Sequence, residues 1–255
     1  MALFTDGNLN TIDNLRVYET GIVNVAVVEG IDLNSKLTLA TDETGAEILA
    51  FLLREWPRDP LSAARRIIGL GGVVVTPPLV RWHVLVTLAL VYSDAHNNQL
   101  NDRYLGKWQA YKQMANAAGL RYFQDGIGLA VKPVPAAAAP SLSSAAGTLA
   151  GQTYFASVTW SSSVAEEGSP SVPLSFDTGI DGLLVVVPPA APPVATGWNV
   201  YAGVTAGGMT RQNSSPLALN SSWIMPATGL VNGVPVTTGQ PPDIYLADQH
   251  RIPRG

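Results

Sequence analysis

The sequence predicts an α+β protein with two unlike domains, an N-terminal α-helical bundle followed by an all-β sandwich and a C-terminal arm. Apolar residues recur at helical spacing in the first half and at the two-residue spacing of strands in the second. Of the 15 Lys and Arg and the 19 Asp and Glu residues, only five lie within residues 133–242. We therefore expect a helical domain at 1–132, a Pro/Ala linker at 133–140, a sandwich at 141–242 and an arm at 243–255.

The first two helices follow from apolar stripes. A stripe spaced by three or four residues predicts one helix, which Asn10 or Thr11 would cap by accepting a backbone N–H. A second helix is expected from about Ser35 to Trp56, with Gly45 as a candidate interruption, because prolines at 57 and 60 end it. The stripe of the first helix consists of Ile12, Leu15, Tyr18, Ile22 and Val25.

The next segments lead to a central helix. Residues 59–70 predict a short helix that ends in glycines, and residues 73–75 a brief extended piece. Thr76 followed by Pro77 is a typical helix start, because proline suits the first helical position. The segment 79–92 that follows is apolar nearly all round, so we expect a buried central helix.

The last predicted helix carries an aromatic stripe. A loop at 93–99 joins it to the central helix and makes the two an antiparallel hairpin. We assign the aromatic residues of the stripe to packing between helices or between subunits, in preference to the stacking of nucleic-acid bases. The stripe consists of Leu100, Tyr104, Trp108, Tyr111, Ala115, Ala118 and Tyr122.

After residue 140 short β-rich runs alternate with turn sequences, a pattern typical of an antiparallel sandwich. Residues 154–160 alternate large and small side chains, as a half-buried strand does. Residues 171–176, 183–187, 198–202 and 222–225 predict further strands. The final segment, 243–255, is polar and is either a disordered end or an arm that orders on a partner.

Composition excludes several functions. A chain without cysteine has no disulfide, no thiolate zinc site and no cysteine nucleophile. A formal net charge of −4 with no basic cluster gives no footprint for sequence-independent nucleic-acid binding. The N-terminus lacks the pattern of a signal peptide, and the longest apolar run is shorter than the ~20 residues of a membrane-spanning helix. We expect a non-secreted protein that does not enter membranes.

No pattern of residues indicates catalysis. His83, His96 and His250 are not at the spacing of metal ligands, and we expect His83 to be a buried structural histidine. The glycines at 69–72 lack the lysine of a phosphate-binding loop. Glu166 and Glu167 precede a glycine and indicate a β-turn rather than a pair of catalytic carboxylates. We therefore expect no enzymatic activity, no cofactor and no metal.

Two segments carry a resemblance to known families. Residues 28–37 (VEGIDLNSKL) and 100–111 (LNDRYLGKWQAY) make the helical half similar to head–tail adaptor, or head completion, proteins of tailed double-stranded DNA bacteriophages. Residues 154–160, 166–171 and 198–201 make the second half similar to the immunoglobulin-like or fibronectin type III modules appended to phage structural proteins. The module lacks the Cys–Trp–Cys pattern of antibody domains, so only the sandwich carries over.

The resemblance implies a structural protein of the virion neck, made in the host cytoplasm. Such a protein forms a homo-oligomeric ring, usually dodecameric, beneath the portal protein and continues the DNA channel to a tail or nozzle protein. Genomic DNA passes through without sequence-specific binding, and tail fibres are a further partner. The C-terminal arm of the family docks on the portal. In this chain its candidate residues are Ile244, Tyr245, Leu246, His250, Arg251 and Ile252.

The alternative function comes from a different class. The sandwich would anchor tail fibres or bind host-surface carbohydrate, with the helical bundle as its mount. Trp198, Tyr201 and Trp223 are the aromatic residues that could stack on sugars, although core positions suit them equally well.

Overall fold

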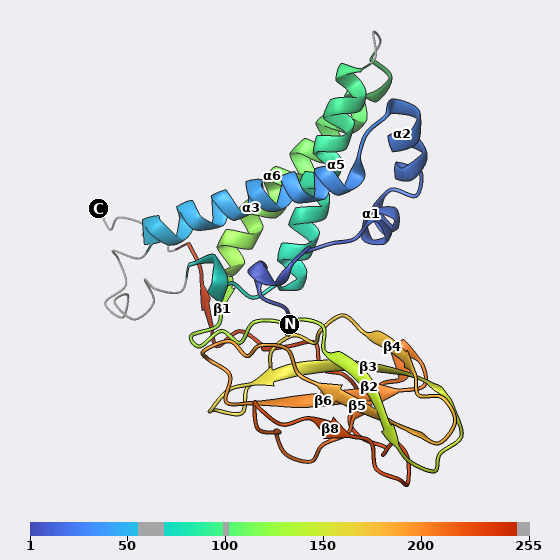
Figure 1. The fold of residues 1–255 in the computed structure, drawn as a ribbon. Coiled ribbons are helices and arrows are strands. Elements are labelled where there is room, and N and C mark those ends of the chain that lie inside the picture. The colour runs from blue at the N-terminus through green and yellow to red at the C-terminus, as the bar shows by residue number, and fades with distance from the viewer. Residues whose placement is uncertain (56–68, 99–101, 249–255) are drawn as a thin grey trace. The chain divides into compact units, whose positions relative to one another are not determined.

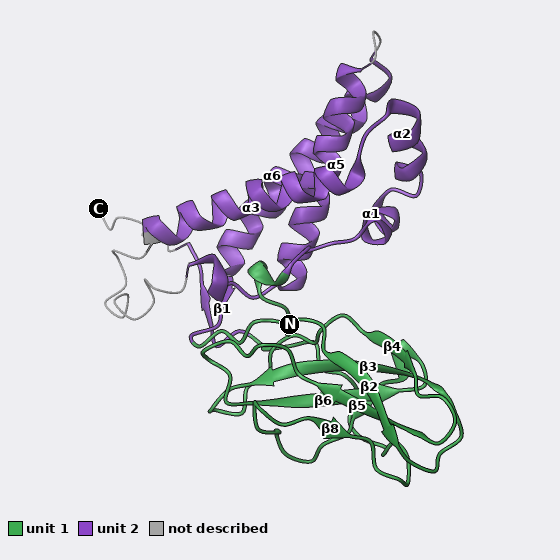
Figure 2. Ribbon diagram, in the orientation of Figure 1, with its two compact units in different colours: residues 1–6, 132–241 green, residues 7–131, 242–255 purple. Residues whose placement is uncertain are grey.

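The chain divides into two compact units. The computed structural model describes residues 1–55, 69–98 and 102–248 (Figure 1). We call residues 7–131 and 242–255 the helical unit, and residues 1–6 and 132–241 the β unit (Figure 2). The protein is therefore α+β, with its helices in the N-terminal half and its main sheets in the C-terminal half.

The unit boundaries differ from the predicted domains at both ends of the chain. The first six residues belong to the β unit, where the Ala136 amide donates to Asp6 Oδ1 at 2.8 Å. The last residues belong to the helical unit, so residues 243–248 are not a separate arm. The β unit is thus inserted between two parts of the helical unit, and the chain passes from one unit to the other three times.

The helical unit is built mainly from five α-helices in its described residues. Short 3₁₀ turns lie at Leu70–Gly72 (η3) and at Asp102–Tyr104 (η4). A core of buried residues from α1, α2, α3, α5 and η4 holds the unit together, with α5 contributing the largest share and partly buried residues of α6 packed against it. The helices are α1 (Ile12–Tyr18), α2 (Ile22–Glu29), α3 (Leu33–Glu55), α5 (Pro77–Asn97) and α6 (Leu105–Asp125).

The single helix predicted from Ile12 to Val25 is wrong, because the chain breaks between α1 and α2. Thr11 caps α1 as one of the two predicted candidates, accepting from the Asn14 amide. Glu19 then has extended backbone angles and ends α1. Because Leu15 and Ile22 are both buried across the break, the apolar stripe reflects a shared core and not one continuous helix. Gly30 ends α2 with a φ of 66°, which glycine adopts without strain.

The central helix is confirmed and is longer than predicted. It starts at Pro77 and continues to Asn97, so residues 93–97 of the predicted loop are helical. Thr76 precedes it but makes no side-chain capping bond. Helix α3 likewise continues through Gly45 without interruption. Most of the helix predicted at 59–70, and residue 100 of the aromatic stripe, lie outside the described residues.

Helices α5 and α6 lie side by side along much of their length, and α3 crosses them (Figure 1). Their close approach depends on Gly119, which faces the ring of Trp82. A Cβ atom at position 119 would lie 2.8 Å from Trp82 Nε1 and 2.9 Å from its Cε2. Trp82 also contacts the rings of Tyr122 and Phe123, with ring centroids at 5.7 and 5.4 Å. A shift of the indole away from position 119 would disturb these ring contacts.

Replacing Gly119 with alanine is expected to destabilise the helical unit by about 1–3 kcal/mol, because the added methyl overpacks the contact with Trp82. Alanine favours helices more than glycine does, so propensity alone predicts the opposite sign. A Cβ atom added to Gly106 on the same helix would meet nothing within 4 Å. Urea unfolding should therefore show no loss for Gly106→Ala, and equal stability of the two variants would contradict the packing.

The β unit holds two antiparallel sheets. One has the strand order β2-β5-β8 and the other β4-β3-β6-β7. Five of these strands overlap predicted runs, while β2 and β7 were missed. The strands are β2 (Ser141–Ala146), β3 (Thr153–Ser161), β4 (Leu174–Asp177), β5 (Gly182–Val187), β6 (Gly197–Gly203), β7 (Thr210–Arg211) and β8 (Trp223–Ile224).

One apolar core joins the two sheets. Trp160 on β3 and Trp198 on β6 are opposite each other in register and are both buried. Leu184 and Val186 on β5 belong to the same buried cluster. The Trp198 indole N–H donates to the carbonyl of Ala218 at 2.9 Å, which satisfies its polar atom inside the core.

The Pro/Ala segment at 133–140 is not a free linker but packs into the β unit. Val134 is fully buried, and its amide donates to Gln240 Oε1 at 3.0 Å. The amide of Ala137 donates to the carbonyl of Ser169. These contacts satisfy backbone groups that a solvated linker would leave to water.

Two short strands of the helical unit come just before and just after the β unit in the sequence. Strand β1 (Ile127–Leu129) pairs with β9 (Ile244–Leu246) in an antiparallel ladder. Two bonds to Asp243 extend the ladder: its amide donates to the carbonyl of Leu129 at 2.9 Å, and the amide of Val131 donates to its Oδ2 at 2.7 Å. Residues 244–246 of the expected arm are therefore ordered by pairing within their own chain.

Candidate interaction surface of the helical unit

Helix α6 has a buried side and an outer side. Ala115, Gly119 and Tyr122 lie on the buried side, toward α5. Met114 and Leu120 are on the outer side, where Leu120 is 65% exposed. An apolar side chain this exposed on a helix surface indicates an interaction surface when others accompany it. Two of the grooves that border this helix differ in charge.

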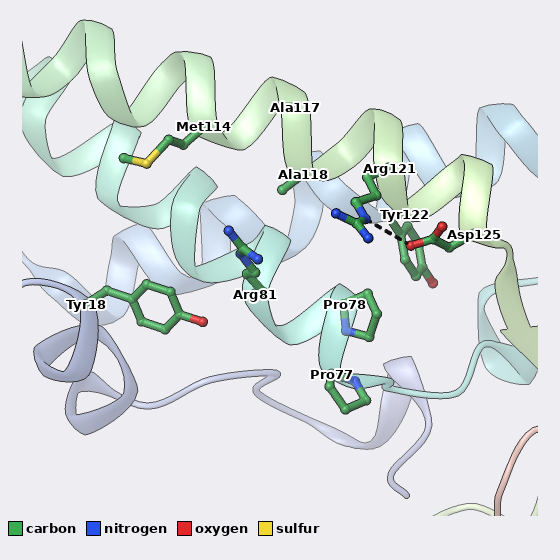
Figure 3. A pocket seen from close by; sticks show the side chains of 10 residues that line it. All are labelled: Tyr18, Pro77, Pro78, Arg81, Met114, Ala117, Ala118, Arg121, Tyr122 and Asp125. Carbon is green, nitrogen blue, oxygen red and sulfur yellow. Dashed lines mark hydrogen bonds and ion pairs between the residues drawn. The ribbon is translucent and has the colours of Figure 1, made fainter.

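The first groove, which we call the basic groove, has a volume of about 640 Å³ between α1, the start of α5, and α6. Figure 3 shows Arg81 of α5 and Arg121 of α6 pointing into it, with Tyr18 and Met114 toward one end. Arg121 pairs with Asp125 at 3.3 Å. No residue in the described ranges forms an ion pair with Arg81. The groove therefore carries an excess of positive charge.

The second groove, which we call the acidic groove, has a volume of about 630 Å³ between α3 and α6, with α5 at its floor. Glu43 and Glu47 of α3 line it, and Leu120 of α6 forms part of its wall. Within the described part of the chain neither glutamate has an ion-pair partner. The outer side of α6 therefore separates an excess of positive charge from an excess of negative charge.

The four aromatic residues predicted to pack on α6 differ in burial. Tyr104 and Tyr122 are buried, whereas Trp108 and Tyr111 are only partly buried. Tyr111 stacks on Tyr92 of α5, with ring centroids 5.4 Å apart. The structure thus places all four along the contact between α5 and α6 of one chain, where Trp108 stacks on His96 at 5.5 Å.

A charged cluster holds α6 to the break between α1 and α2. Lys107 Nζ donates to Glu19 Oε2 at 2.5 Å, and the Tyr111 hydroxyl donates to the same oxygen at 3.0 Å. Burial alone would raise the pKa of Glu19, but the hydrogen bonds from Lys107 and Tyr111 outweigh it and lower that pKa. Burial, together with the bond to Glu19, raises the pKa of Tyr111 to about 12. This cluster therefore has a structural role, because it holds α6 against the segment between α1 and α2.

His83 is the buried structural histidine that the sequence predicts. Its Nδ1 lies 3.0 Å from Asn10 Nδ2, and its Nε2 lies 2.9 Å from Thr41 Oγ1 and 3.2 Å from the carbonyl oxygen of Leu37. Burial lowers its pKa to about 4, against the opposing effect of the Leu37 carbonyl. It therefore connects the N-terminal segment, α3 and α5 as a neutral side chain.

The candidate portal-binding residues of the C-terminus separate into two groups. Ile244, Tyr245 and Leu246 form β9, and of these Tyr245 is the most exposed. Beyond them, the Asp248 amide donates to the carbonyl of Phe123 at 2.9 Å. His250, Arg251 and Ile252 lie outside the described residues.

Sequence reasoning missed the role of Glu167 in the β unit. Its Oε1 accepts hydrogen bonds from Thr159, from Asn199 Nδ2 at 2.9 Å and from the Tyr201 hydroxyl at 2.8 Å. The alternation along β3 and β6 contains the signal, because these polar residues alternate with core residues such as Trp160. They therefore share the outer face of the sheet, where one acceptor can bind several donors.

Neither a metal site nor a membrane span emerges from the described residues. No group of three or more His, Asp or Glu side chains there could hold a metal ion. None of the helices there has the length and apolar character needed to cross a membrane. Comparison of the chain with models of protein families, with characterised proteins and with solved structures finds no match.

Proposed function

We propose that this protein is a structural head–tail adaptor of a tailed bacteriophage. It assembles into a ring, dodecameric in the family it resembles, beneath the portal protein in the neck of the virion. The ring continues the DNA channel toward a tail or nozzle protein. A mildly acidic chain suits such a channel, because DNA must pass without binding to its wall.

One observation carries this proposal: the helical unit exposes large apolar residues on several of its helices. Val17 on α1 is 83% exposed, and Val27 and Val28 on α2 are 76% and 70% exposed. On α3 Leu53 is 57% exposed, and on α6 Leu120 is exposed as well. Single exposed apolar residues are ordinary, but a set spread over α1, α2, α3 and α6 suits a subunit that contacts neighbours on more than one side.

The topology of the β unit supports an immunoglobulin-like module as the appended domain. If β2 to β7 are taken as strands B, C, C′, E, F and G, the sheets become B-E and C′-C-F-G, as in immunoglobulin domains. The buried Trp160 then lies on strand C, where that fold has a buried tryptophan. Strand β8 departs from the pattern, since it follows β7 as the last strand of the β unit and pairs with β5.

Two measurements test the proposal: the mass of the assembly in solution and its binding to the portal protein. The purified chain should sediment as a closed oligomer, or should form one when mixed with portal rings, and it should co-purify with the portal. A protein that stays monomeric at high concentration and does not bind portal assemblies would overturn the adaptor function.

Residues 249–255 are the part of the proposed arm whose deletion leaves β9 in the chain. Deleting residues 249–255, which include His250, Arg251 and Ile252, should weaken portal binding about tenfold or more if they supply two or three contacts. Surface plasmon resonance on immobilised portal rings measures this change. Deleting residues 243–255 is a poor test, because it also removes β9 and its ladder with β1. Unchanged affinity of the shorter deletion would exclude an arm there.

The alternative function, binding of host-surface carbohydrate by the β unit, gains no support from its aromatic residues. Trp198, Tyr201 and Trp223 are buried, with exposures of 0%, 1% and 8%. A sugar stacks on an exposed ring face, so these residues do not form such a platform. Anchoring of tail fibres has no specific observation in its favour.

A further inference from the structure

The two grooves beside α6 are complementary in charge. The basic groove holds Arg81 and Arg121, with Asp125 as its one acidic residue. The acidic groove holds Glu43 and Glu47 and no basic residue. Opposite charges on two sides of one exposed helix suit a contact between copies of the same chain, because such a contact joins two different patches that must match in charge.

We propose that a second copy of this chain docks with its α3 against the basic groove and places Glu43 and Glu47 beside Arg81 and Arg121. The inference rests on the proposed function, because it names the contact through which the ring would form. It commits to this pair of surfaces, whereas the size and closure of the assembly belong to the proposed function.

The arrangement of charges in one chain supports this docking. Glu43 and Glu47 are four residues apart on α3, so they lie on the same face one turn apart, and both are exposed. Like charges at this spacing repel each other and weaken a helix slightly. No cation in the described ranges pairs with either of them, and no anion there pairs with Arg81. A neighbouring copy would neutralise both excesses at once.

Apolar contacts next to the charges would supply most of the affinity. Exposed ion pairs contribute little by themselves, since water and salt screen them. Met114 and Tyr18 lie at the basic groove, and Leu120 lies at the acidic groove. The charges then determine which surfaces meet, because placing like charges together disfavours every other pairing.

The experiment exchanges the two charges. The first variant, Arg81→Glu/Arg121→Glu, makes both grooves acidic, and the second, Glu43→Arg/Glu47→Arg, makes both basic. Each alone should associate with itself at least about tenfold more weakly than the wild type, because like charges meet at the contact. An equimolar mixture should regain wild-type association as an alternating assembly, measured by sedimentation velocity and light scattering.

Matched controls separate the grooves from general charge effects. Asp42→Arg changes a neighbouring residue of α3 outside the acidic groove, and Lys112→Glu changes an exposed residue of α6 outside the basic groove. Both should associate like the wild type. Because Arg121 pairs with Asp125, Arg81→Glu alone serves as a second basic-groove variant that leaves that ion pair intact. It should weaken association in the same direction, and circular dichroism should confirm that its helices are retained.

Each outcome decides the inference. Loss in both double variants with recovery on mixing supports it, even if the assembly does not bind portal, a result that would overturn only the proposed function. Wild-type association that persists in the double variants overturns the inference and leaves an adaptor ring standing. Loss without recovery on mixing overturns it too, because some other partner or contact then occupies the grooves. A wild-type chain that is monomeric at every concentration overturns the inference, and it overturns the proposed function as well if the chain also fails to bind portal assemblies.

Discussion

Replacing His83 with alanine is expected to lower the free energy of unfolding of the helical unit by about 4 kcal/mol at pH 7.5. The substitution leaves a buried cavity, and it leaves a buried polar group without its hydrogen-bond partner. The ring is fully buried, so little water can enter to compensate. Asn10 would lose the acceptor for one of its amide hydrogens, while its other bond, to the carbonyl of Val80 at 3.0 Å, remains. Urea unfolding followed by circular dichroism at the helix band measures the loss.

The neighbours of His83 determine its protonation state. The carbonyl of Val80 can only accept, so the atom of Asn10 that faces it is the nitrogen, and the same nitrogen faces His83 Nδ1. Asn10 Oδ1 accepts from Asn14 Nδ2 at 2.8 Å, which fixes the same orientation. His83 Nδ1 must therefore accept, and Nε2–H donates toward Thr41 and the carbonyl of Leu37. A second proton on the ring would have to sit on Nδ1, where it would face the N–H donor of Asn10.

The stability should consequently depend on pH. The unfolded chain binds a proton at His83 near pH 6.5, while the folded chain does so only near pH 4, so between these values the unfolded state holds more protons. The stabilisation is fully present above pH 6.5 and is lost as the pH falls toward 4. The difference between the two pKa values corresponds to about 3 kcal/mol of the free energy of unfolding.

A comparison of variants isolates this contribution from the carboxylates that also titrate in acid. The destabilisation caused by His83→Ala should shrink by about 2–3 kcal/mol between pH 7.5 and pH 4.5, because the wild type has lost its own contribution there. Thr87→Ala is the matched control, since Thr87 is buried one turn along α5 and does not titrate. A His83→Ala penalty that is constant with pH, like that of Thr87→Ala, would show that the buried histidine does not control acid stability.

Replacing Glu167 with alanine is expected to destabilise the β unit by about 3 kcal/mol, since a charged acceptor shared by three side-chain donors is lost. Thr159 and Asn199 are buried on the outer face of the sheet and would be left without this acceptor. Burial and the bond to Glu167 raise the pKa of the Tyr201 phenol, which keeps it protonated as a donor. Thermal unfolding monitored by tryptophan fluorescence measures the effect, because Trp160 and Trp198 lie in the core of this unit.

Graded substitutions test whether the carboxylate itself matters. Tyr201→Phe removes one donor and should cost about 1 kcal/mol. Glu167→Gln keeps an oxygen acceptor at this place but removes its negative charge and so weakens all three bonds, and its loss should therefore fall between those of the other two variants. If Glu167→Ala destabilised no more than Tyr201→Phe, the shared acceptor would be unimportant and the turn interpretation would suffice.

The elements that the sequence predicts well are those whose pattern is local. The apolar character of residues 79–92 and the Thr-Pro start predict α5, whose burial the structure confirms. Strand β3 is predicted from the alternating side chains at residues 154–160, but the structure buries it on both faces, where the pattern predicted a half-buried strand. The break between α1 and α2 was missed because Leu15 and Ile22 contact one core, and a shared core keeps the helical period across an interruption.

The candidate site was predictable only in part. The aromatic stripe of α6 indicated a packing surface, and the structure buries Tyr104 and Tyr122 on it. The basic groove and the acidic groove lie on either side of the outer side of α6. Neither groove has a sequence signature, because Arg81 and Arg121 are 40 residues apart and meet only when α5 packs on α6. Glu43 and Glu47 at one-turn spacing are visible in the sequence, but their isolation from cations is not.

The sequence by itself determined that this protein is α+β, with a normally charged helical half and a nearly uncharged β half, because periodicity and composition are properties of adjacent residues. Only the tertiary structure decided where the units begin and end. It assigned residues 1–6 to the β unit and paired β9 with β1, so that the β unit interrupts the helical one. Strand pairing and buried hydrogen bonds join residues more than a hundred positions apart, and such partners are chosen by packing, which no local pattern records.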